Sequence, residues 1–318
     1  MEIQTQQPKK KILLDASALK LSACSRRLYL TVLEGYRSKV NNNDIEFGVA
    51  FHKFTAAVEE ANDPSGFAKG IIESRNYFEN TPMFIKDNKK YLTPNYLAAV
   101  CADWYNKVRP RQNFTILRAT DGSPMVEIPF ELKYMEYDDC EVWICGTIDR
   151  IVQVTGGSIV IRDYKTTSSW GKDEYFRSYL LSVQLRLYLW AFLRVCAQAP
   201  EGSLLAKVQK PSQVGMAIDG IFLNGADKFE FQASPINYLK QEDLDEFEKM
   251  LKDEVDRLVL LWQSATLPMR EGIMNDSCSK YSGCPFSVAC SSPDQTAYGH
   301  IMKNNFIQKN FDPLSYHE

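Results

Sequence analysis

The sequence predicts an α/β protein in which a central β-sheet is flanked by helices. Apolar residues recur at helical spacing in the first 61 residues, and short runs over 125–166 are rich in β-branched and aromatic residues. A long apolar helix and two further strands follow. The chain has 318 residues, of which 45% are hydrophobic and 24% charged, so it can bury a large core.

The net charge and the N-terminal sequence narrow the classes of protein. A formal charge of −3 creates no overall basic field, so a nucleic-acid partner would have to be held by local patches and bound metal. The apolar run after the first basic residues is too short for a secretory signal, and no stretch approaches the ~20 apolar residues of a membrane span. We therefore expect a cytoplasmic protein with no membrane partner.

The N-terminal part of the chain is expected to be helical. Residues 15–36, DASALKLSACSRRLYLTVLEGY, predict a helix with Asp15 or Ser17 as its N-cap, and residues 45–61 predict a second helix. A mainly helical segment should follow over 65–108, broken near each of its two prolines.

The middle of the chain changes to the period of β-strands. The runs MVEIPFELKYM, EVWICGTIDRIVQV and SIVIRDYKT, residues 125–135, 141–154 and 158–166, predict three successive strands. Two further strands are expected over 214–223 and 228–233. The β-branched and aromatic content of these runs indicates strands that are largely buried in a sheet.

Two helices are predicted after the first strands. The nearly all-apolar run over 179–197 must be buried on most of its surface, and residues 242–264 form an amphipathic helix that we interpret as structural. No repeat or Pro-, Gly- or Ser-rich linker marks a boundary, so we expect one domain over 1–318. Within it, the helices at about 65–110 are an insertion and a cysteine-rich segment spans about 275–292.

The strands over 141–166 are expected to form a hairpin with charged residues on it. Glycines in VTGG supply the positive φ of a turn, and a loop at 155–157 would pair residues whose numbers sum to 312, placing Asp149 opposite Asp163. Side chains alternate along a strand, so Lys165 shares the face of Asp163. Opposed carboxylates destabilise a sheet unless a divalent cation lies between them. The alternative is an exposed hairpin with solvated charges, because an isolated Asp-x-Lys is common.

These residues resemble the PD-(D/E)XK nuclease superfamily, in its RecB-like branch with the CRISPR-adaptation exonucleases and AddB-type nucleases. GTIDRI followed by IVIRDYKT looks like the branch's strand pair, which implies metal-binding acids at Asp149 and Asp163 and a catalytic Lys165. QLRLY resembles its Gln-x-x-x-Tyr motif, which implies that Gln184 and Tyr188 also belong to the catalytic site. The resemblance implies a restriction-endonuclease-like core, with a mixed sheet between helices.

A histidine and a further acid extend the resemblance. FGVAFHKFTAAVEE is similar to the branch's Gly-x-x-x-His helix, which implies that His52 binds Mg²⁺ or Mn²⁺ together with Asp149, Asp163 and the backbone carbonyl of Tyr164. A lone histidine on an apolar helix face can instead be a hydrogen-bonded core residue. Glu127, one strand before the hairpin, is a candidate for an additional acid near the metal.

Four of the eight cysteines carry a separate prediction. In a chain without an export signal, metal binding or burial is favoured over disulfides. CSKYSGCPFSVAC contributes Cys278, Cys284 and Cys290, and SACSRRLYL contributes Cys24. The resemblance implies that they hold a 4Fe-4S cluster. The first C-terminal gap is five residues where Cys-x-x-Cys is more usual, so zinc or no metal remains an alternative.

The combined interpretation is a metal-dependent DNA nuclease that hydrolyses phosphodiester bonds. The resemblance implies an exonuclease on single-stranded DNA or DNA ends, in recombination, repair or phage DNA metabolism, with other recombination or replication proteins as partners. Candidates for a basic track along the DNA, or for scattered solubilising charge, are Arg26, Arg27, Arg109, Arg111, Lys207 and Lys210. Two other classes remain open: a non-cleaving nucleic-acid-binding or scaffold protein with this fold, and a structural metalloprotein that uses only the cysteines.

Overall fold

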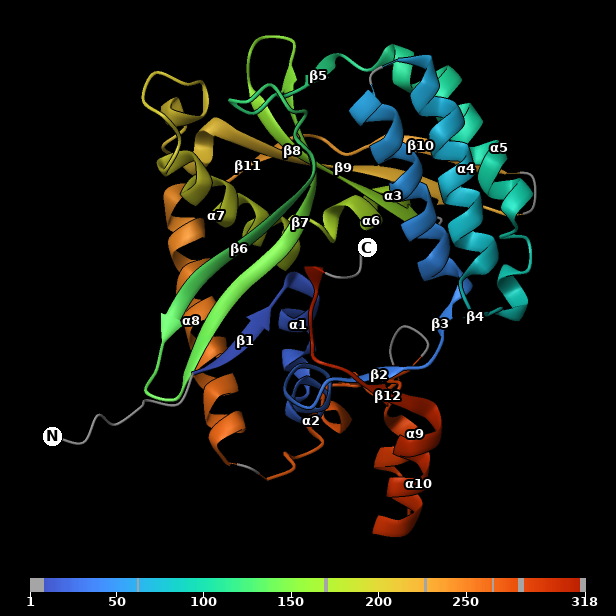
Figure 1. The fold of residues 1–318 in the computed structure, drawn as a ribbon, viewed down its shortest axis with the longest axis vertical. Helices are drawn as coiled ribbons and strands as arrows, with labels where there is room; N and C mark the ends of the chain where they lie inside the picture. Colours follow the sequence, from blue (N-terminus) through green and yellow to red (C-terminus); the bar gives the residue numbers. More distant parts are fainter. Residues whose placement is uncertain are drawn as a thin grey trace, which may run out of the picture. The chain divides into compact units, whose positions relative to one another are not determined.

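The chain divides into two compact units. The computed structural model describes residues 9–61, 63–168, 171–225, 228–264, 266–279 and 283–314. Unit 1 comprises 1–39, 129–146 and 246–318, and unit 2 comprises 40–128 and 147–245. Figure 1 shows the order of the helices and strands along the chain.

The central sheet is mixed, as predicted. Its strands follow the order β7 (Cys140–Val154), β8 (Ile159–Thr167), β9 (Val214–Leu223) and β10 (Phe229–Ala233). The pairs β7–β8 and β9–β10 are antiparallel, whereas β8–β9 is parallel. Three more strands pair onto β7 and β9, namely β5 (Phe114–Ile116), β6 (Val126–Glu136) and β11 (Asn237–Tyr238). The predicted strands over 125–166, 214–223 and 228–233 are therefore confirmed.

The helices of unit 2 pack on the sheet. They are α3 (Asn43–Ala61), α4 (Pro64–Asn80), α5 (Pro94–Asp103), α6 (Lys172–Arg177) and α7 (Val183–Ala197), and short strands β3 (Asn41–Asn42) and β4 (Met83–Phe84) pair beside them. The helices α3, α4 and α5 lie side by side in Figure 1. Their buried side chains share a core with Tyr164 and Ile221. Asp163 alternates with Tyr164 along β8 and contacts α7 through Gln184. The two faces of β8 thus contact different helices.

The predicted helices over 45–61, 65–108 and 242–264 agree with the structure, whereas the helix over 179–197 begins later than predicted. α4 ends before Pro82 and α5 begins at Pro94, so the predicted breaks are confirmed. The apolar helix over 179–197 begins only at Val183, where Ser182 accepts a hydrogen bond as its N-cap. The residues before it form a turn that leaves Leu181 exposed.

Unit 1 contains the remaining elements. They are β1 (Lys10–Leu14), α1 (Ala16–Lys20), α2 (Ser25–Leu28), β2 (Tyr36–Ser38), most of α8 (Gln241–Ser264), α9 (Ser287–Cys290), α10 (Gln295–Asn305) and β12 (Phe306–Gln308). β1 pairs in parallel with the first residues of β7, and β2 pairs with β12. β1 is not predictable from the sequence, because the apolar run ILL that follows the basic residues is only three residues long.

The single helix predicted over 15–36 is wrong. Asp15 caps α1 as expected, but the backbone at Cys24 is extended (φ −146°, ψ 107°) and separates α1 from α2. Arg257 donates to the carbonyl of Ser22 at 2.6 Å, so this carbonyl has a partner outside the helix. Because the carbonyl is satisfied by a side chain of α8, the chain can leave the helix at this point without an unpaired polar group.

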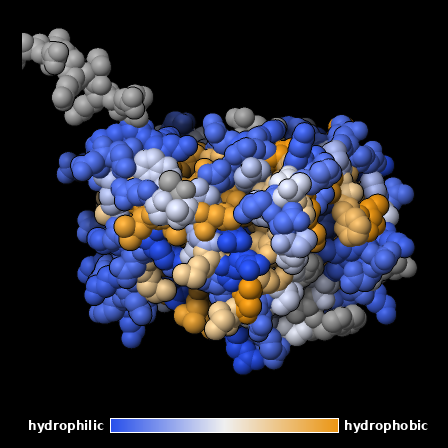
Figure 2. All heavy atoms as spheres, turned by 90° about the horizontal axis from the view of Figure 1, so that it is seen from below, coloured by the Kyte–Doolittle hydropathy of each residue, from blue (hydrophilic) through white to orange (hydrophobic). Residues whose placement is uncertain are grey.

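Hydrophobic side chains occur in the helices and on the surface of the part of the chain that is described. No helix there is both long and apolar enough to cross a bilayer. On the face drawn in Figure 2, hydrophilic side chains predominate and hydrophobic ones form separate patches.

Candidate active site

The β7–β8 hairpin has the predicted register. The pairs run from Arg150↔Arg162 to Gln153↔Ile159, and each pair of numbers sums to 312. Gly156 and Gly157 in the turn have the expected positive φ, 103° and 91°. The ladder ends at Arg150, however, so Asp149 is not a directly opposed partner of Asp163.

Asp149 instead binds the backbone of β8. Its Oδ2 accepts a hydrogen bond of 2.8 Å from the amide of Tyr164, and the carbonyl of Tyr164 lies 3.0 Å from Nε2 of His52. The peptide groups of one residue thus fix both Asp149 and His52. With Nε2 donating to this carbonyl, Nδ1 is the ring nitrogen that faces the acids.

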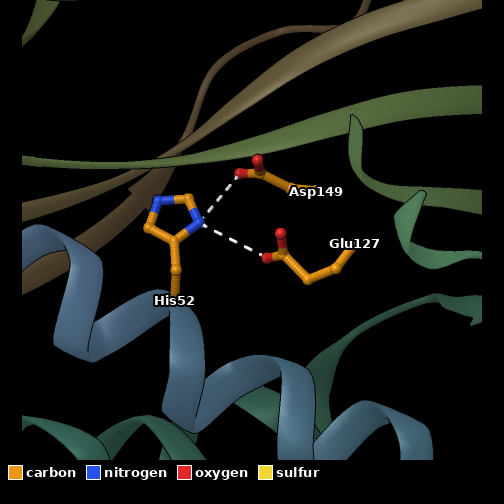
Figure 3. Close-up of side chains that lie close together, drawn as sticks. All are labelled: His52, Glu127 and Asp149. Atoms are coloured by element: carbon orange, nitrogen blue, oxygen red, sulfur yellow. Dashed lines mark ion pairs between the residues drawn. The ribbon is translucent and has the colours of Figure 1, made fainter. Parts of the chain in front are cut away.

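His52, Asp149 and Glu127 converge on one point (Figure 3). Nδ1 of His52 lies 3.3 Å from Oδ2 of Asp149 and 3.8 Å from Oε1 of Glu127. Burial alone would lower the pKa of His52, but the charges of Asp149 and Glu127 raise it to about 9. One ligand atom from each of these three residues lies within 4.8 Å of the other two, which is close enough for all three to bind one metal ion. Within the described residues, no other set of three His, Cys, Asp or Glu side chains meets this criterion.

The approach of α3 to β8 depends on a glycine. Gly48 lies one helical turn before His52, and a Cβ added to it would lie 3.0 Å from Oγ1 of Thr166 in β8. That separation is tighter than an ordinary van der Waals contact, so a side chain at this position would press the helix and the strand apart. The Gly-x-x-x-His spacing therefore has a packing reason as well as a chemical one.

Glu127 reaches this point through an unusual backbone conformation. Its φ is 45°, in the left-handed region that non-glycine residues rarely adopt. A strand normally turns successive side chains to opposite faces, and a left-handed residue breaks that alternation. Strained residues of this kind cluster at functional sites. Glu127, predicted from the sequence only as an additional candidate, thus lies beside the two predicted ligands His52 and Asp149.

The remaining predicted catalytic residues lie around Asp163, which is fully buried. Nζ of Lys165 makes an ion pair of 2.5 Å with Oδ2 of Asp163, and Nε2 of Gln184 donates to Oδ1 at 3.1 Å. Gln184 also donates to the hydroxyl of Tyr188, one turn along α7, at 2.8 Å. The structure therefore brings Asp163, Lys165, Gln184 and Tyr188 into one hydrogen-bonded group.

Burial and neighbouring charges shift the ionisation of this group. Burial, followed by the charge of Asp149, raises the pKa of Asp163 to about 6, against the opposing effect of Lys165. Burial would lower the pKa of Lys165, but Asp163 and Asp149 raise it above its usual range. The three carboxylates of Glu127, Asp149 and Asp163 thus have two cationic partners, His52 and Lys165.

The donor set fits a divalent cation. The ligand atoms are Nδ1 of His52 and one carboxylate oxygen each of Asp149 and Glu127. Carboxylate oxygens suit Mg²⁺ and Mn²⁺. Acids this close repel one another unless a proton or a cation lies between them. Asp163 lies outside the group of three, and the carbonyl of Tyr164 is engaged by His52.

The opposite face of the hairpin holds a buried ion network that the sequence analysis missed. Arg150, whose side chain is completely buried, is paired with both Glu59 and Asp219. Arg162 binds Asp219 through two nitrogens, at 2.8 and 2.5 Å, and Tyr164 donates its hydroxyl to Glu59 at 2.9 Å. The signal that could have revealed it is the acid within the apolar strand VGMAIDGIFL.

The four predicted cluster cysteines all belong to unit 1. Cys284 donates its amide to the carbonyl of Cys278 at 2.8 Å. A Cβ at Gly272 would lie 3.0 Å from Sγ of Cys278 and 3.4 Å from Cβ of Cys24, so both cysteines lie close to this glycine. Burial raises the pKa of the Cys284 and Cys290 thiols, with smaller contributions from neighbouring cysteines. No three of the described cysteine sulfurs lie within 4.8 Å of one another.

The candidate basic residues are divided between the units. Arg26 and Arg27 belong to unit 1, where they oppose the burial that raises the pKa of Cys290 and Cys284, respectively. Arg26 also donates to the carbonyl of Pro268 at 2.8 Å. The other four belong to unit 2. A continuous basic track stays a prediction.

Comparison with known proteins identifies the class. The family model of the PD-(D/E)XK nuclease superfamily matches residues 16–291, so the chain belongs to this superfamily. A solved structure named SSO0001 is similar over 78% of both chains, with 13% identity and a TM-score of 0.31. A candidate exonuclease from Eubacterium rectale is similar over 82% of this chain and 85% of its own, with 13% identity and a TM-score of 0.44. No curated protein matches the sequence.

Proposed function

We propose that this protein is a metal-dependent deoxyribonuclease, an exonuclease that hydrolyses phosphodiester bonds in single-stranded DNA or at DNA ends. The observation that carries the proposal is the convergence of His52, Asp149 and Glu127 beside the Asp163–Lys165 pair. Membership of the PD-(D/E)XK nuclease superfamily supports hydrolysis of phosphodiester bonds as the class of reaction. The preference for DNA, the direction of cutting and a role in recombination, repair or phage DNA metabolism belong to the proposal.

The metal would be held by residues from three elements. His52, Asp149 and Glu127 supply the convergent donors, with Asp163 and the carbonyl of Tyr164 as further ligands for one or two Mg²⁺ or Mn²⁺ ions. When bound, such an ion lowers the pKa of water and stabilises charge on an attacked phosphate.

The remaining residues would act on the water and the strand. Lys165, held by Asp163, orients the attacking water, and its ammonium group helps the water to lose its proton to solvent and stabilises charge that develops on the phosphate. Gln184 fixes the orientation of Asp163, and Tyr188 orients Gln184. Gln184 and Tyr188 therefore position both the carboxylate and the substrate.

The first test is cleavage of end-labelled single- and double-stranded DNA with Mn²⁺, by the wild type and by Lys165→Ala. We expect metal-dependent cutting that the variant loses by at least about 10²-fold, because a preorganised charge is removed from the site. The products give the polarity. Absence of cutting by the wild type on every substrate would instead favour the non-cleaving, nucleic-acid-binding alternative.

We also propose that Cys24, Cys278, Cys284 and Cys290 hold a 4Fe-4S cluster, with zinc as the alternative. Support comes from four free cysteines in one unit, two of them packed around Gly272. Anaerobically purified protein should contain iron and sulfide, and Cys284→Ala should lose both together with stability. Cys196→Ala, at a buried cysteine of unit 2, is the matched control and should keep them. Zinc without iron would contradict the cluster.

The wider organisation is also a proposal. The family match extends over residues of both compact units, which supports a single nuclease domain over 1–318 with an inserted helical segment at about 65–110. A cytoplasmic location, and recombination or replication proteins as partners, complete the proposal. Size-exclusion chromatography of limited-proteolysis products would test the organisation, since a single domain should resist separation into two stable fragments.

A further inference from the structure

A pocket of about 780 Å³ lies in unit 2 on the face of the sheet that carries Asp163. Met216 and Ile218 of β9 line it, and Ile218 is paired with Asp163 in the parallel ladder, so both side chains share one face. Phe176 of α6 and Leu185 of α7 complete an apolar floor. The volume is that of a site for a compact organic ligand, which is on the order of 300–1,000 Å³.

The pocket adjoins the candidate active site at two places. Tyr179 lines the pocket and is close enough to Lys165 and Asp163 for both charges to act on its phenol. Leu185 of the pocket follows directly after Gln184, the residue that donates to Asp163. The pocket is therefore close enough to Lys165 for one molecule to reach both.

The lining favours a flat, mainly apolar ligand with polar edges. The floor is aliphatic and aromatic, whereas the polar groups of the lining belong to Asp173, Arg177, Tyr179, Gln232, Ser234 and Asn237. The amide side chains can both donate and accept hydrogen bonds. The lining contains one acid, Asp173, and one guanidinium, Arg177, so it has no excess positive charge and does not suit a bare phosphate. A nucleobase has the required apolar faces and hydrogen-bonding edge.

We propose that this pocket receives one unpaired nucleobase of a DNA strand whose phosphate lies at the candidate active site. The proposal rests on the proposed nuclease function and specifies its substrate. A base stacked and paired within a duplex cannot enter without leaving the helix, so the pocket selects single strands and frayed ends over duplex interiors. Stacking against rings and aliphatic side chains is tolerant of sequence, so we expect little base preference.

An abasic scan tests the pocket. Lys165→Ala protein, which suppresses cutting, is titrated with Mn²⁺ present against single-stranded oligonucleotides of about eight nucleotides, within the size of single-strand sites. Each oligonucleotide lacks the base at one position, and affinity is measured by fluorescence anisotropy. We expect a loss of about 5- to 100-fold at one position and smaller losses elsewhere, because one base loses its stacking partners.

A pocket-filling variant provides the second arm. Gln232 is exposed on β10, so Gln232→Trp should fold and occupy the pocket, and the position-specific loss should disappear in that background. Gln198→Trp, exposed after the last turn of α7, is the matched control and should retain it. Normal binding with a flat abasic profile in the unfilled protein would overturn the pocket alone. Failure to bind any DNA would contradict the proposed nuclease function as well.

Discussion

The two faces of the β7–β8 hairpin differ in how their charges are balanced. On the arginine face, which carries Arg150 and Arg162, each carboxylate has a guanidinium partner. Arg150 is paired with Glu59 and Asp219, and Arg162 binds Asp219 through two nitrogens. Although burial alone would raise the pKa of Asp219, Arg150 and Arg162 hold it below its usual range. Positive and negative charges therefore compensate one another within the protein.

On the acid face, which carries Asp149 and Asp163, the charges are not balanced. Lys165 is paired with Asp163, while Asp149 and Glu127 converge on His52. Both faces carry buried charges on β7 and β8, namely Arg150 and Arg162 on one face and Asp149 and Asp163 on the other, so burial alone does not separate a structural network from a functional site. The difference is that the acid face needs an external cation or proton for compensation. Unbalanced buried charge is thus the more informative sign of function.

The largest expected effect is on stability, from the arginine face. Arg150→Met removes the partner of two carboxylates and leaves buried, uncompensated charge, which should lower the free energy of unfolding by about 3–5 kcal/mol. Urea denaturation would measure it. Arg111→Met, at an exposed position, is the matched control and should change stability by less than about 0.5 kcal/mol. A similar small loss in both variants would mean that the arginine face is not the balanced network inferred above.

The next effect is stabilisation by metal, from the acid face. Because a cation that binds only the folded protein stabilises it, Mn²⁺ at 100 times its dissociation constant should add about 2.7 kcal/mol to the free energy of unfolding. Asp149→Asn removes one charged donor and should abolish most of this gain. Arg111→Met should keep the gain in full. Equal stabilisation of wild type and Asp149→Asn by Mn²⁺ would place the bound ion elsewhere.

Local features of the site could be predicted from the sequence, whereas distant ones could not. The register of the hairpin follows from the loop length and the turn glycines, so the face of Asp163 and Lys165 was predictable from local sequence. Glu59 and Asp219 join Arg150 only through the packing of α3 and β9, which local patterns do not encode. The break of the helix at Cys24 likewise depends on a contact with α8.

The smallest expected effect comes from the contact between α3 and β8. Helix α3 supplies His52 to the acid face and Glu59 to the arginine face. Gly48→Ala places a Cβ about 3.0 Å from Oγ1 of Thr166, so the helix or the strand must shift by a few tenths of an ångström. The gain in helix propensity, about 1 kcal/mol, should offset most of the strain, leaving stability nearly unchanged. The displacement of His52 should instead weaken Mn²⁺ binding several-fold, measured by calorimetry.

A compensating substitution separates this displacement from a general loss of structure. Thr166→Ala removes the hydroxyl that the new Cβ meets, so the double variant Gly48→Ala/Thr166→Ala should recover most of the Mn²⁺ affinity. If Gly48→Ala binds Mn²⁺ as the wild type does, the close approach at Gly48 has no bearing on His52. If the double variant binds as weakly as Gly48→Ala, the weakening arises from a change in α3 itself and not from its separation from β8.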